Sequence, residues 1–358
     1  MPVRCVNKQS TREGMKMNAK SMIKGLLGSV LLMASLGQAS AEQIKLTIST
    51  WAPPSHGVNA TMFPWMIKQI EERTEGRVTA ELKYNLAPPP AQADVVSDGL
   101  ADISWITHHY TPGRFPSALI ADVPGMGGSA EALAVAYWRT YEKFFKQANE
   151  HGDLMVLALH SHGDGLLHTS RKISSLSEIS GMKLRIGGGV AGLVGDALGA
   201  VAINVPAPKV YETLASHAAD GVLMPMEAKK GFNLTEVAEH TYKMPSGFYH
   251  TSMATIMNRS KFESLEERDQ AALNELFGEE LSRITGRFWD EFDAEGLEAL
   301  KADPDNTLTI ASEADQAIWA EMTAEITQNV IDDVAKTGID AQAAYDFFKS
   351  ELAKLDAK

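Results

Sequence analysis

The chain contains a single cysteine, Cys5, among its 358 residues. One cysteine excludes a disulfide-stabilised scaffold and any metal site built from several thiolates. Basic residues are also scarce, because 33 Lys and Arg stand against 46 Asp and Glu, giving a net charge of −13. This balance argues against nucleic acid and anionic membrane surfaces as partners, since both are themselves negative. Hydrophobic residues make up 44% of the chain, enough for sizeable cores, and no low-complexity tract indicates disorder.

The first 41 residues have the pattern of a secretory signal peptide. Three lysines precede an apolar run over residues 25–36, which is followed by small residues at Ala39 and Ala41. This arrangement predicts Sec export with cleavage after Ala41, because the run is too short to anchor a protein in a bilayer. The translation start stays open between Met1, Met15 and Met17.

Cleavage after Ala41 would remove the only cysteine and six of the basic residues. The remaining 317 residues would carry 27 basic and 45 acidic side chains, a net charge of −18. A cysteine-free, strongly acidic chain suits an oxidising compartment. The sequence therefore predicts a periplasmic protein.

Hydrophobic patterns in the rest of the chain predict strands that alternate with helices. An alternating strand pattern covers residues 43–50, and a helix is expected from Met62 to about Gly76. Further strands are expected at 78–84, 102–106, 154–160, 183–187 and 201–205. The pattern is almost wholly helical over 265–300 and again over 311–356. Such alternation indicates an α/β fold with mixed or largely parallel sheets.

A histidine-rich segment provides the first candidate for chemistry. His160, His162 and Asp164 resemble the H-x-H-x-D-H motif of metallo-hydrolases, whose imidazoles and carboxylate suit zinc. The last histidine of that motif is missing, because position 165 is glycine. A periplasmic metallo-hydrolase is thus the alternative hypothesis, and a polar strand end facing a cleft is the preferred one.

A glycine-rich loop follows the strand expected at 183–187. Gly187, Gly189 and Gly192 satisfy the G-x-G-x-x-G pattern of dinucleotide-binding loops. An exported chain meets no NAD, so no cofactor is expected. The loop nevertheless opens a helix, and its free N–H groups would suit an anion.

Arg185 lies just before this loop, in a strand that is otherwise apolar. Arginine is seldom buried without a partner. Three interpretations stay open from the residues alone: a structural salt bridge, an exposed strand edge, or a guanidinium presented to a solute carboxylate.

The central part of the chain resembles the solute-binding proteins of TRAP transporters, the DctP family. In that family, a D-L-x-G-x-K-x-R segment leads to L-G-A, E-V-Y-x-A-L and V-D-G at similar spacing. The corresponding segments here are L-S-E-I-S-G-M-K-L-R (176–185), L-G-A (198–200), V-Y-E-T-L (210–214) and A-D-G (219–221). Asp98, Gly99, Asp102 and Ile103 match a further motif, so the resemblance extends over the chain that follows the leader.

The resemblance implies a two-domain receptor of the periplasmic-binding-protein type, with an interdomain cleft and a long helix that spans both domains. The helical run 265–300 fits that helix. The implied domains are 42–163 with 251–288, and 164–250 with 289–358. Such a protein would be a monomer that captures a small organic acid without catalysis and delivers it to integral-membrane TRAP permease subunits. Service to a sensor or to another permease stays open.

The resemblance also implies that Arg185 is the carboxylate-binding arginine. Three positions depart from residues that family members carry. Gly165 stands in place of a second arginine of many members, and Ala207 in place of a phenylalanine that relatives often have. Met224 stands in place of the asparagine of members that bind sialic acid. Fewer polar groups and more apolar surface predict a monocarboxylate, such as an aromatic or hydroxy acid, in preference to a sugar acid.

Other candidates for lining the cleft are residues near strand ends and crossover loops. They are Trp51, His56, Thr107, His108, Gly187, Ala207, Met224, Phe248 and Tyr249. Thr107 or a histidine is expected to meet a second polar group of the solute. Trp105 lies within a strand and is expected in the core. No cofactor and no metal ligands are predicted, and whether a metal ion bridges the solute stays open.

Overall fold

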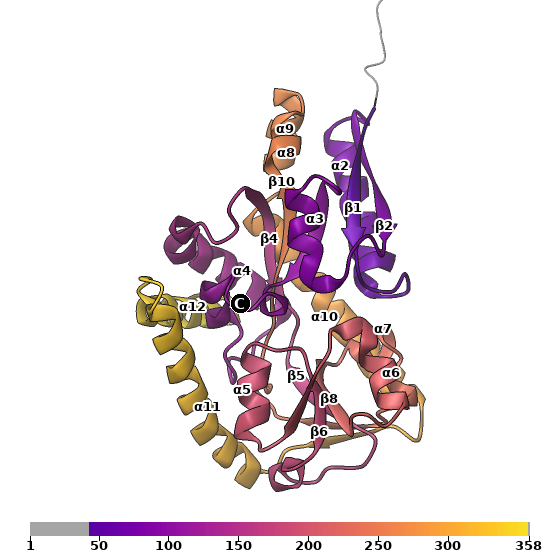
Figure 1. The fold of residues 1–358 in the computed structure, drawn as a ribbon, viewed down its shortest axis with the longest axis vertical. Coiled ribbons are helices and arrows are strands. Elements are labelled where there is room, and N and C mark those ends of the chain that lie inside the picture. The colour runs from indigo at the N-terminus through magenta and orange to yellow at the C-terminus, as the bar shows by residue number, and fades with distance from the viewer. Residues whose placement is uncertain (1–42, 357–358) are drawn as a thin grey trace, which may run out of the picture. The chain divides into compact units, whose positions relative to one another are not determined.

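The computed structural model describes residues 43–356, which form one compact unit with two β-sheets (Figure 1). The predicted signal peptide lies outside the described residues. The first sheet has the strand order β2-β1-β3-β10-β4. Its strands are β1 (Ile44–Thr50), β2 (Val78–Tyr84), β3 (Ile103–Thr107), β4 (Leu154–Ser161) and β10 (Ser252–Asn258). β1 pairs in parallel with β2 and β3, whereas β10 is antiparallel to both of its neighbours.

The second sheet has the order β11-β9-β5-β8-β6-β7. Its strands are β5 (Gly165–Thr169), β6 (Lys183–Ile186), β7 (Val201–Asn204), β8 (Gly221–Pro225), β9 (His240–Lys243) and β11 (Thr307–Ile310). β6 is parallel to β7 and β8, and β5 is antiparallel to β8 and β9. The chain therefore leaves the first sheet after β4, returns to it for β10, and adds β11 to the second sheet afterwards.

Helices cover both sheets. They are α2 (Phe63–Arg73), α3 (Gln92–Ser97), α4 (Ala130–Thr140), α5 (Val190–Ala197), α6 (Val210–Ala215), α7 (Ala228–Gly231), α8 (Arg259–Glu263), α9 (Glu267–Asn274), α10 (Glu279–Ala302), α11 (Glu313–Ala335) and α12 (Ala341–Asp356). α2 packs on β2, α3 on β3 and β10, and α5 on β6 and β7.

The long helix α10 connects the two parts of the molecule. It packs against α4 and β4 of the first part and against α7, which follows β8 of the second sheet (Figure 1). Its buried positions include Leu281, Thr285, Trp289 and Phe292, a spacing of three to four residues that places them along one stripe. α10 thus packs against α4 and α7, two helices that are far apart in the sequence.

The fold confirms the predicted α/β class and all six predicted strands to within one or two residues. The helical run predicted over 265–300 is wrong in one respect, because Gly278, at φ +94°, separates α9 from α10. A second break at Gly338, at φ +89°, divides the predicted run 311–356 into α11 and α12. Glycine adopts this left-handed backbone region without the steric penalty of a side chain.

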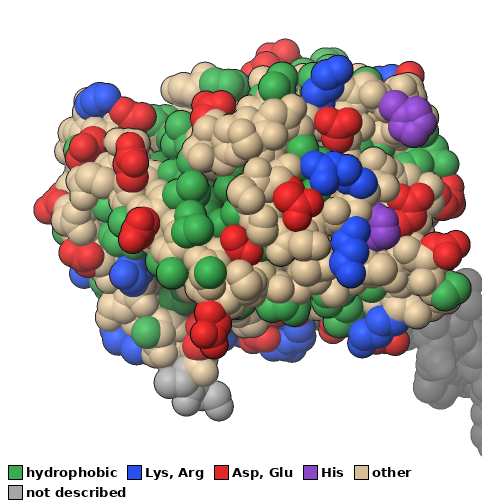
Figure 2. All heavy atoms as spheres, turned by 90° about the horizontal axis from the view of Figure 1, so that it is seen from below, with side chains coloured by type: hydrophobic (Ala, Val, Ile, Leu, Met, Phe, Trp, Pro, Cys, Tyr) green, Lys and Arg blue, Asp and Glu red, His purple; other side chains and the backbone are tan. Residues whose placement is uncertain are grey.

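The surface carries charges of both signs. On the face shown in Figure 2, acidic side chains lie among Lys and Arg side chains. Of the helices formed by residues 43–356, none is both long enough and apolar enough to cross a bilayer.

Two glycines in helices provide a matched test of how tightly α10 is packed. A Cβ at Gly286 would lie 2.4 Å from the carbonyl oxygen of Ala130, whereas a Cβ at Gly192 in α5 would meet no described atom within 4 Å. We expect Gly286→Ala to lower the free energy of unfolding by about 1–3 kcal/mol through overpacking. Gly192→Ala should leave it unchanged or raise it by about 0.5–1 kcal/mol. Urea unfolding of both variants checks this, and equal stabilities would contradict the close packing of α10 on α4.

Candidate functional site

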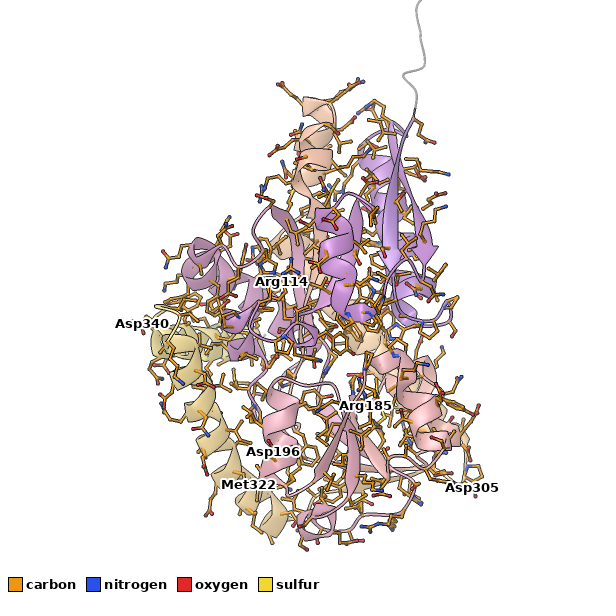
Figure 3. All side chains as sticks on the ribbon, viewed as in Figure 1. Arg114, Arg185, Asp196, Asp305, Met322 and Asp340 are labelled. Carbon is orange, nitrogen blue, oxygen red and sulfur yellow. The ribbon has the colours of Figure 1, made fainter. Side chains whose placement is uncertain are left out.

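A small cavity lies where the strand ends of the two sheets approach each other. It is lined by residues that follow β1 and β3, by β6 and β8, and by α10. The cavity volume is about 50 Å³. This is several times the roughly 10–15 Å³ that one water molecule needs. Arg185 lies in this region, between the part of the ribbon that contains β1 and the part that contains β8 (Figure 3).

Arg185 is the only lysine or arginine that lines the cavity. Its side chain is 3% exposed. The side chains of its neighbours Leu184 and Ile186 point to the opposite face of the sheet and are fully buried. Its Nε donates to the carbonyl oxygen of Val205 at 2.8 Å. Within the described chain no carboxylate forms an ion pair with Arg185. The salt-bridge and exposed-edge interpretations are therefore both wrong.

Tyr110 stands beside the guanidinium. Its hydroxyl oxygen lies 3.5 Å from Nη2 of Arg185 and accepts a hydrogen bond from the backbone N–H of Ala207 at 3.0 Å. Both contacts use the oxygen as the acceptor, and no acceptor for its own hydrogen is found in residues 43–356. The hydroxyl hydrogen is thus free to donate to a ligand anion that reaches Arg185.

The glycine loop makes room for a histidine. A Cβ at Gly187 would lie 2.8 Å from Nε2 of His109, and a Cβ at Gly189 would lie 2.7 Å from its Cβ. Gly188 and Gly189 have φ values of +106° and +58°. Burial, and after it the charge of Arg185, lowers the pKa of His109 to about 3. The imidazole is therefore neutral at pH 7, and the loop is shaped around it rather than around a pyrophosphate.

The cavity walls are aromatic. Trp51 stacks on Trp105 with ring centroids 4.1 Å apart, and Tyr110 meets Trp51 edge-on at 6.0 Å. Trp51 Nε1 donates to the backbone oxygen of Trp105, and Trp105 Nε1 donates to the hydroxyl of Thr50. Because the indole N–H groups are already paired, the ring faces are the surfaces left for a solute.

A buried acid–histidine pair completes the lining. His56 Nε2 lies 3.3 Å from Oε2 of Glu227, and these side chains are 1% and 4% exposed. Phe232 and Trp289 meet the ring of His56 edge-on at 5.1 and 5.9 Å. The site thus combines one cationic group, one acidic group and aromatic walls.

Known proteins resemble this chain in sequence and in fold. Residues 48–333 match the DctP family, described as bacterial extracellular solute-binding protein, family 7. The chain belongs to this family. A TRAP periplasmic solute-binding protein from Bordetella bronchiseptica, solved with bound (R)- and (S)-mandelate, is 36% identical. The match covers 87% of this chain and 100% of that one, with a TM-score of 0.83.

Two further relatives are more distant. A marine metagenome TRAP solute-binding protein from an unidentified microbe, described as specific for aromatic acid ligands, was solved with metahydroxyphenylacetate. It is 27% identical, with 88% of this chain and 100% of that chain covered and a TM-score of 0.82. A protein of Comamonas testosteroni called outer membrane transporter protein TsaT is 26% identical over 339 residues, 91% of this chain and 97% of that protein. These matches confirm that the chain is a TRAP solute-binding protein of the DctP family with the two-domain fold.

Eight of the ten residues singled out from the sequence of this DctP-family protein line the cavity. They are Trp51, His56, Thr107, Arg185, Gly187, Ala207, Met224 and Tyr249. His108 lies outside it, because its ring packs on Phe115 at 4.9 Å and its Nε2 lies 3.1 Å from His151. Phe248 also points away, into the core against Trp319 at 5.1 Å. In both cases the next residue along the chain, His109 or Tyr249, faces the cavity instead.

Several lining residues were not predicted. They are His109, Tyr110, Ala191, Pro225, Glu227, Phe232, Thr251, Met253 and Trp289. His162 also lines the cavity, as expected for a polar strand end that faces a cleft. Trp105 was expected in the core, and it is both buried and part of the cavity wall. His109 and Tyr110 follow β3 directly, so their position at a strand end was a usable signal. Trp289 carries no such signal, because it lies within the buried stripe of α10.

The residues of the candidate zinc motif make contacts within the protein. His160 Nδ1 accepts a hydrogen bond from Trp289 Nε1 at 2.9 Å, and His162 Nδ1 lies 2.7 Å from the carbonyl oxygen of Gly163. Asp164 forms an ion pair with Lys243 at 3.1 Å. Across residues 43–356, no three His, Cys, Asp or Glu side chains are grouped to hold a metal ion. The metallo-hydrolase alternative therefore has no support.

Buried neutral histidines make the stability of the protein depend on pH. Burial lowers the pKa of His109, His160, His162 and His168 to about 3. Between pH 3 and roughly 6.5 the unfolded chain binds more protons than the folded one. The free energy of unfolding therefore falls as the pH falls through this window, by up to about 1.4 kcal/mol per pH unit for each histidine.

His168 is suited to testing this dependence because it lies outside the cavity, where its Nδ1 meets the hydroxyl of Thr241 at 2.9 Å. We expect His168→Asn to be less stable than wild type at pH 7. Its free energy of unfolding should fall less steeply than that of wild type between pH 7 and 5. His217→Asn is the control, because that side chain is exposed to water. Urea unfolding at several pH values measures how the free energy of unfolding of each variant depends on pH. The same dependence in His168→Asn as in wild type would contradict a contribution from buried His168.

Proposed function

We propose that this DctP-family protein is a non-catalytic periplasmic receptor for an aromatic monocarboxylate, which it delivers to a TRAP permease. The observation that carries the proposal is Arg185, a buried guanidinium without a carboxylate partner in the described chain, set in an aromatic-walled cavity. A planar guanidinium forms paired hydrogen bonds with a carboxylate, and the Tyr110 hydroxyl is placed to add a third.

The charge of the cavity favours one carboxylate over two. Arg185 is the only lysine or arginine in its lining, and His109 and His162 have pKa values lowered to about 3 by burial. Glu227 supplies the one acidic side chain in the lining. A second carboxylate would meet no further cation and would be repelled by Glu227.

The relatives favour an aromatic body for the solute. Mandelate and metahydroxyphenylacetate, held by the 36% and 27% identical relatives, are both aromatic monocarboxylates. The stacked pair Trp51 and Trp105 provides a flat wall of the kind that an aromatic ring packs against.

Export and delivery complete the proposal. Residues 1–41 act as a signal peptide with cleavage after Ala41, and the released chain works as a monomer that docks on the membrane subunits of the permease. Its two domains comprise 42–163 with 251–288, and 164–250 with 289–358. The cavity lies between strand ends that both sheets contribute, so closure of the domains would bring both sets of residues onto the solute.

Substitution of Arg185 tests the carboxylate contact. We expect Arg185→Ala to weaken the binding of benzoate and phenylacetate by about 2–5 kcal/mol, because truncation removes a buried charge-assisted contact. Arg185→Lys should also bind weakly, since an ammonium cannot reproduce the planar fork. Arg114→Ala is the control, because Arg114 pairs with Asp94 outside the cavity. Calorimetry measures the affinities, and wild-type binding by folded Arg185→Ala would reject the proposal.

Domain closure is tested in solution. Only a closed form can contact the solute from both sides, so ligand should shift the population towards it. We expect small-angle scattering to show a smaller radius of gyration with a bound aromatic acid than without it. An unchanged radius at saturating ligand would contradict a hinged receptor.

A further inference from the structure

The pair formed by His56 and Glu227 shares the cavity with Arg185 but makes no contact with it. His56 follows β1, and Glu227 follows β8 just before α7. Both side chains are almost fully buried and both line the cavity. Nothing in the carboxylate site around Arg185 accounts for them.

The hydrogen on His56 can be assigned from its contacts. The backbone N–H of Val58 donates to Nδ1 of His56 at 3.2 Å, so Nδ1 is the unprotonated nitrogen. The hydrogen of the ring therefore lies on Nε2, which faces Oε2 of Glu227 at 3.3 Å. His56 acts as the donor of the pair, and Glu227 is the acceptor.

The position of Glu227 is fixed by its surroundings. Its backbone N–H donates to Oδ1 of Asp293 at 2.8 Å. A Cβ at Gly296 would lie 2.8 Å from Cα of Glu227, and a Cβ at Gly231 would lie 2.4 Å from its Oε2. Two glycines thus allow α10 and α7 to close around this residue. Burial, together with the nearby Glu227, raises the pKa of Asp293 well above its usual range.

The carboxyl group of Glu227 has capacity to accept further hydrogen bonds. A carboxylate offers two oxygens and about four acceptor sites. In residues 43–356, His56 is the only side chain that faces it within ion-pair distance. A buried acceptor that lacks donors costs free energy, and a ligand in the cavity is in place to supply one.

Aromatic rings separate this pair from the guanidinium. Nη2 of Arg185 lies 3.5 Å from the hydroxyl of Tyr110, whose ring meets Trp51 at 6.0 Å. Trp51 stacks on Trp105 at 4.1 Å, and Trp105 lies 6.0 Å from the ring of His56. The order along the wall is therefore guanidinium, aromatic platform, and acid–histidine pair. A solute bound to Arg185 with its ring on the platform extends towards Glu227.

We propose that Glu227, oriented by His56, forms a second polar subsite that accepts a hydrogen bond from a hydroxyl or amino group on the aromatic ring of the solute. The inference rests on the proposed function and narrows it to aromatic monocarboxylates that carry a hydrogen-bond donor away from the carboxylate. A solute without such a donor adds no hydrogen bond to the one that His56 supplies to Glu227, so it gains less on binding.

The first test compares solutes on the wild-type protein and requires no variant. Calorimetry is run with benzoate, 3- and 4-hydroxybenzoate, 4-aminobenzoate and 4-methylbenzoate. We expect at least one hydroxy or amino acid to bind roughly tenfold more tightly than benzoate, and the methyl analogue to show no such gain. Comparison of the hydroxybenzoates with 4-aminobenzoate identifies which hydrogen-bond donor the subsite prefers. Equal affinities across the series would overturn the subsite.

The second test removes the acceptor. In Glu227→Ala, we expect the ratio between the affinities for the preferred acid and for benzoate to fall to about one. Glu227→Gln retains the size of the side chain. It should lower the ratio between the affinities for the preferred acid and for benzoate, even if the alanine variant folds poorly. The control is Glu295→Gln, because Glu295 is exposed and pairs with Lys230 at the surface. A wild-type ratio in both Glu227 variants would overturn the assignment.

The two proposals fail in different ways. If benzoate binds in an Arg185-dependent manner but ring substituents make no difference, the receptor function stands and the Glu227 subsite is rejected. If none of the aromatic acids binds the folded wild-type protein, the proposed function is rejected, and the subsite with it.

Discussion

Burying the guanidinium of Arg185 away from water costs free energy that no carboxylate in the described chain offsets. The surrounding residues offset part of this cost, through the carbonyl oxygen of Val205 and the hydroxyl of Tyr110. A carboxylate bound as proposed would offset the rest of this cost. The glycine loop and the neutral His109 serve the same end, since they fill the space beside the guanidinium without adding an acid.

The distribution of charge in the cavity has an additional consequence for selectivity. Burial keeps His109 and His162 neutral, so the positive charge is confined to one place, and the acidic group Glu227 lies beyond the aromatic wall. With the two proposed subsites, a polar solute would be selected by the order of its groups as well as by their number. Its carboxylate would bind at Arg185 and its hydrogen-bond donor at Glu227.

The sequence predicted the fold well where the pattern was regular. β1, with its alternating side chains, and β6, with its single arginine, were both expected, whereas β8 was not, because a five-residue strand buried along its whole length has no alternation. The break at Gly278 was hidden by the helical patterns on both sides of it. Arg185 was found because its family resemblance and its apolar surroundings agreed. His108 and Phe248 were one position from the residues that face the cavity, an offset that depends on local backbone direction. Glu227 gave no signal, because its partner His56 is 171 positions away in the chain.

Strand β10 lies between β3 and β4 and is antiparallel to both. Its residues follow the five strands β5–β9 of the other sheet, so β3 and β4 have open edges facing each other until residue 252 and its successors have been made. Contacts between residues so distant in sequence form slowly, since a long loop must close first. The first sheet therefore cannot be completed until residues 252–258 have been made. In this periplasmic solute-binding protein, the part of the cavity wall formed by Thr107 and its strand partner Met253 is thus assembled only after the strands that carry Arg185 and Met224 have been made.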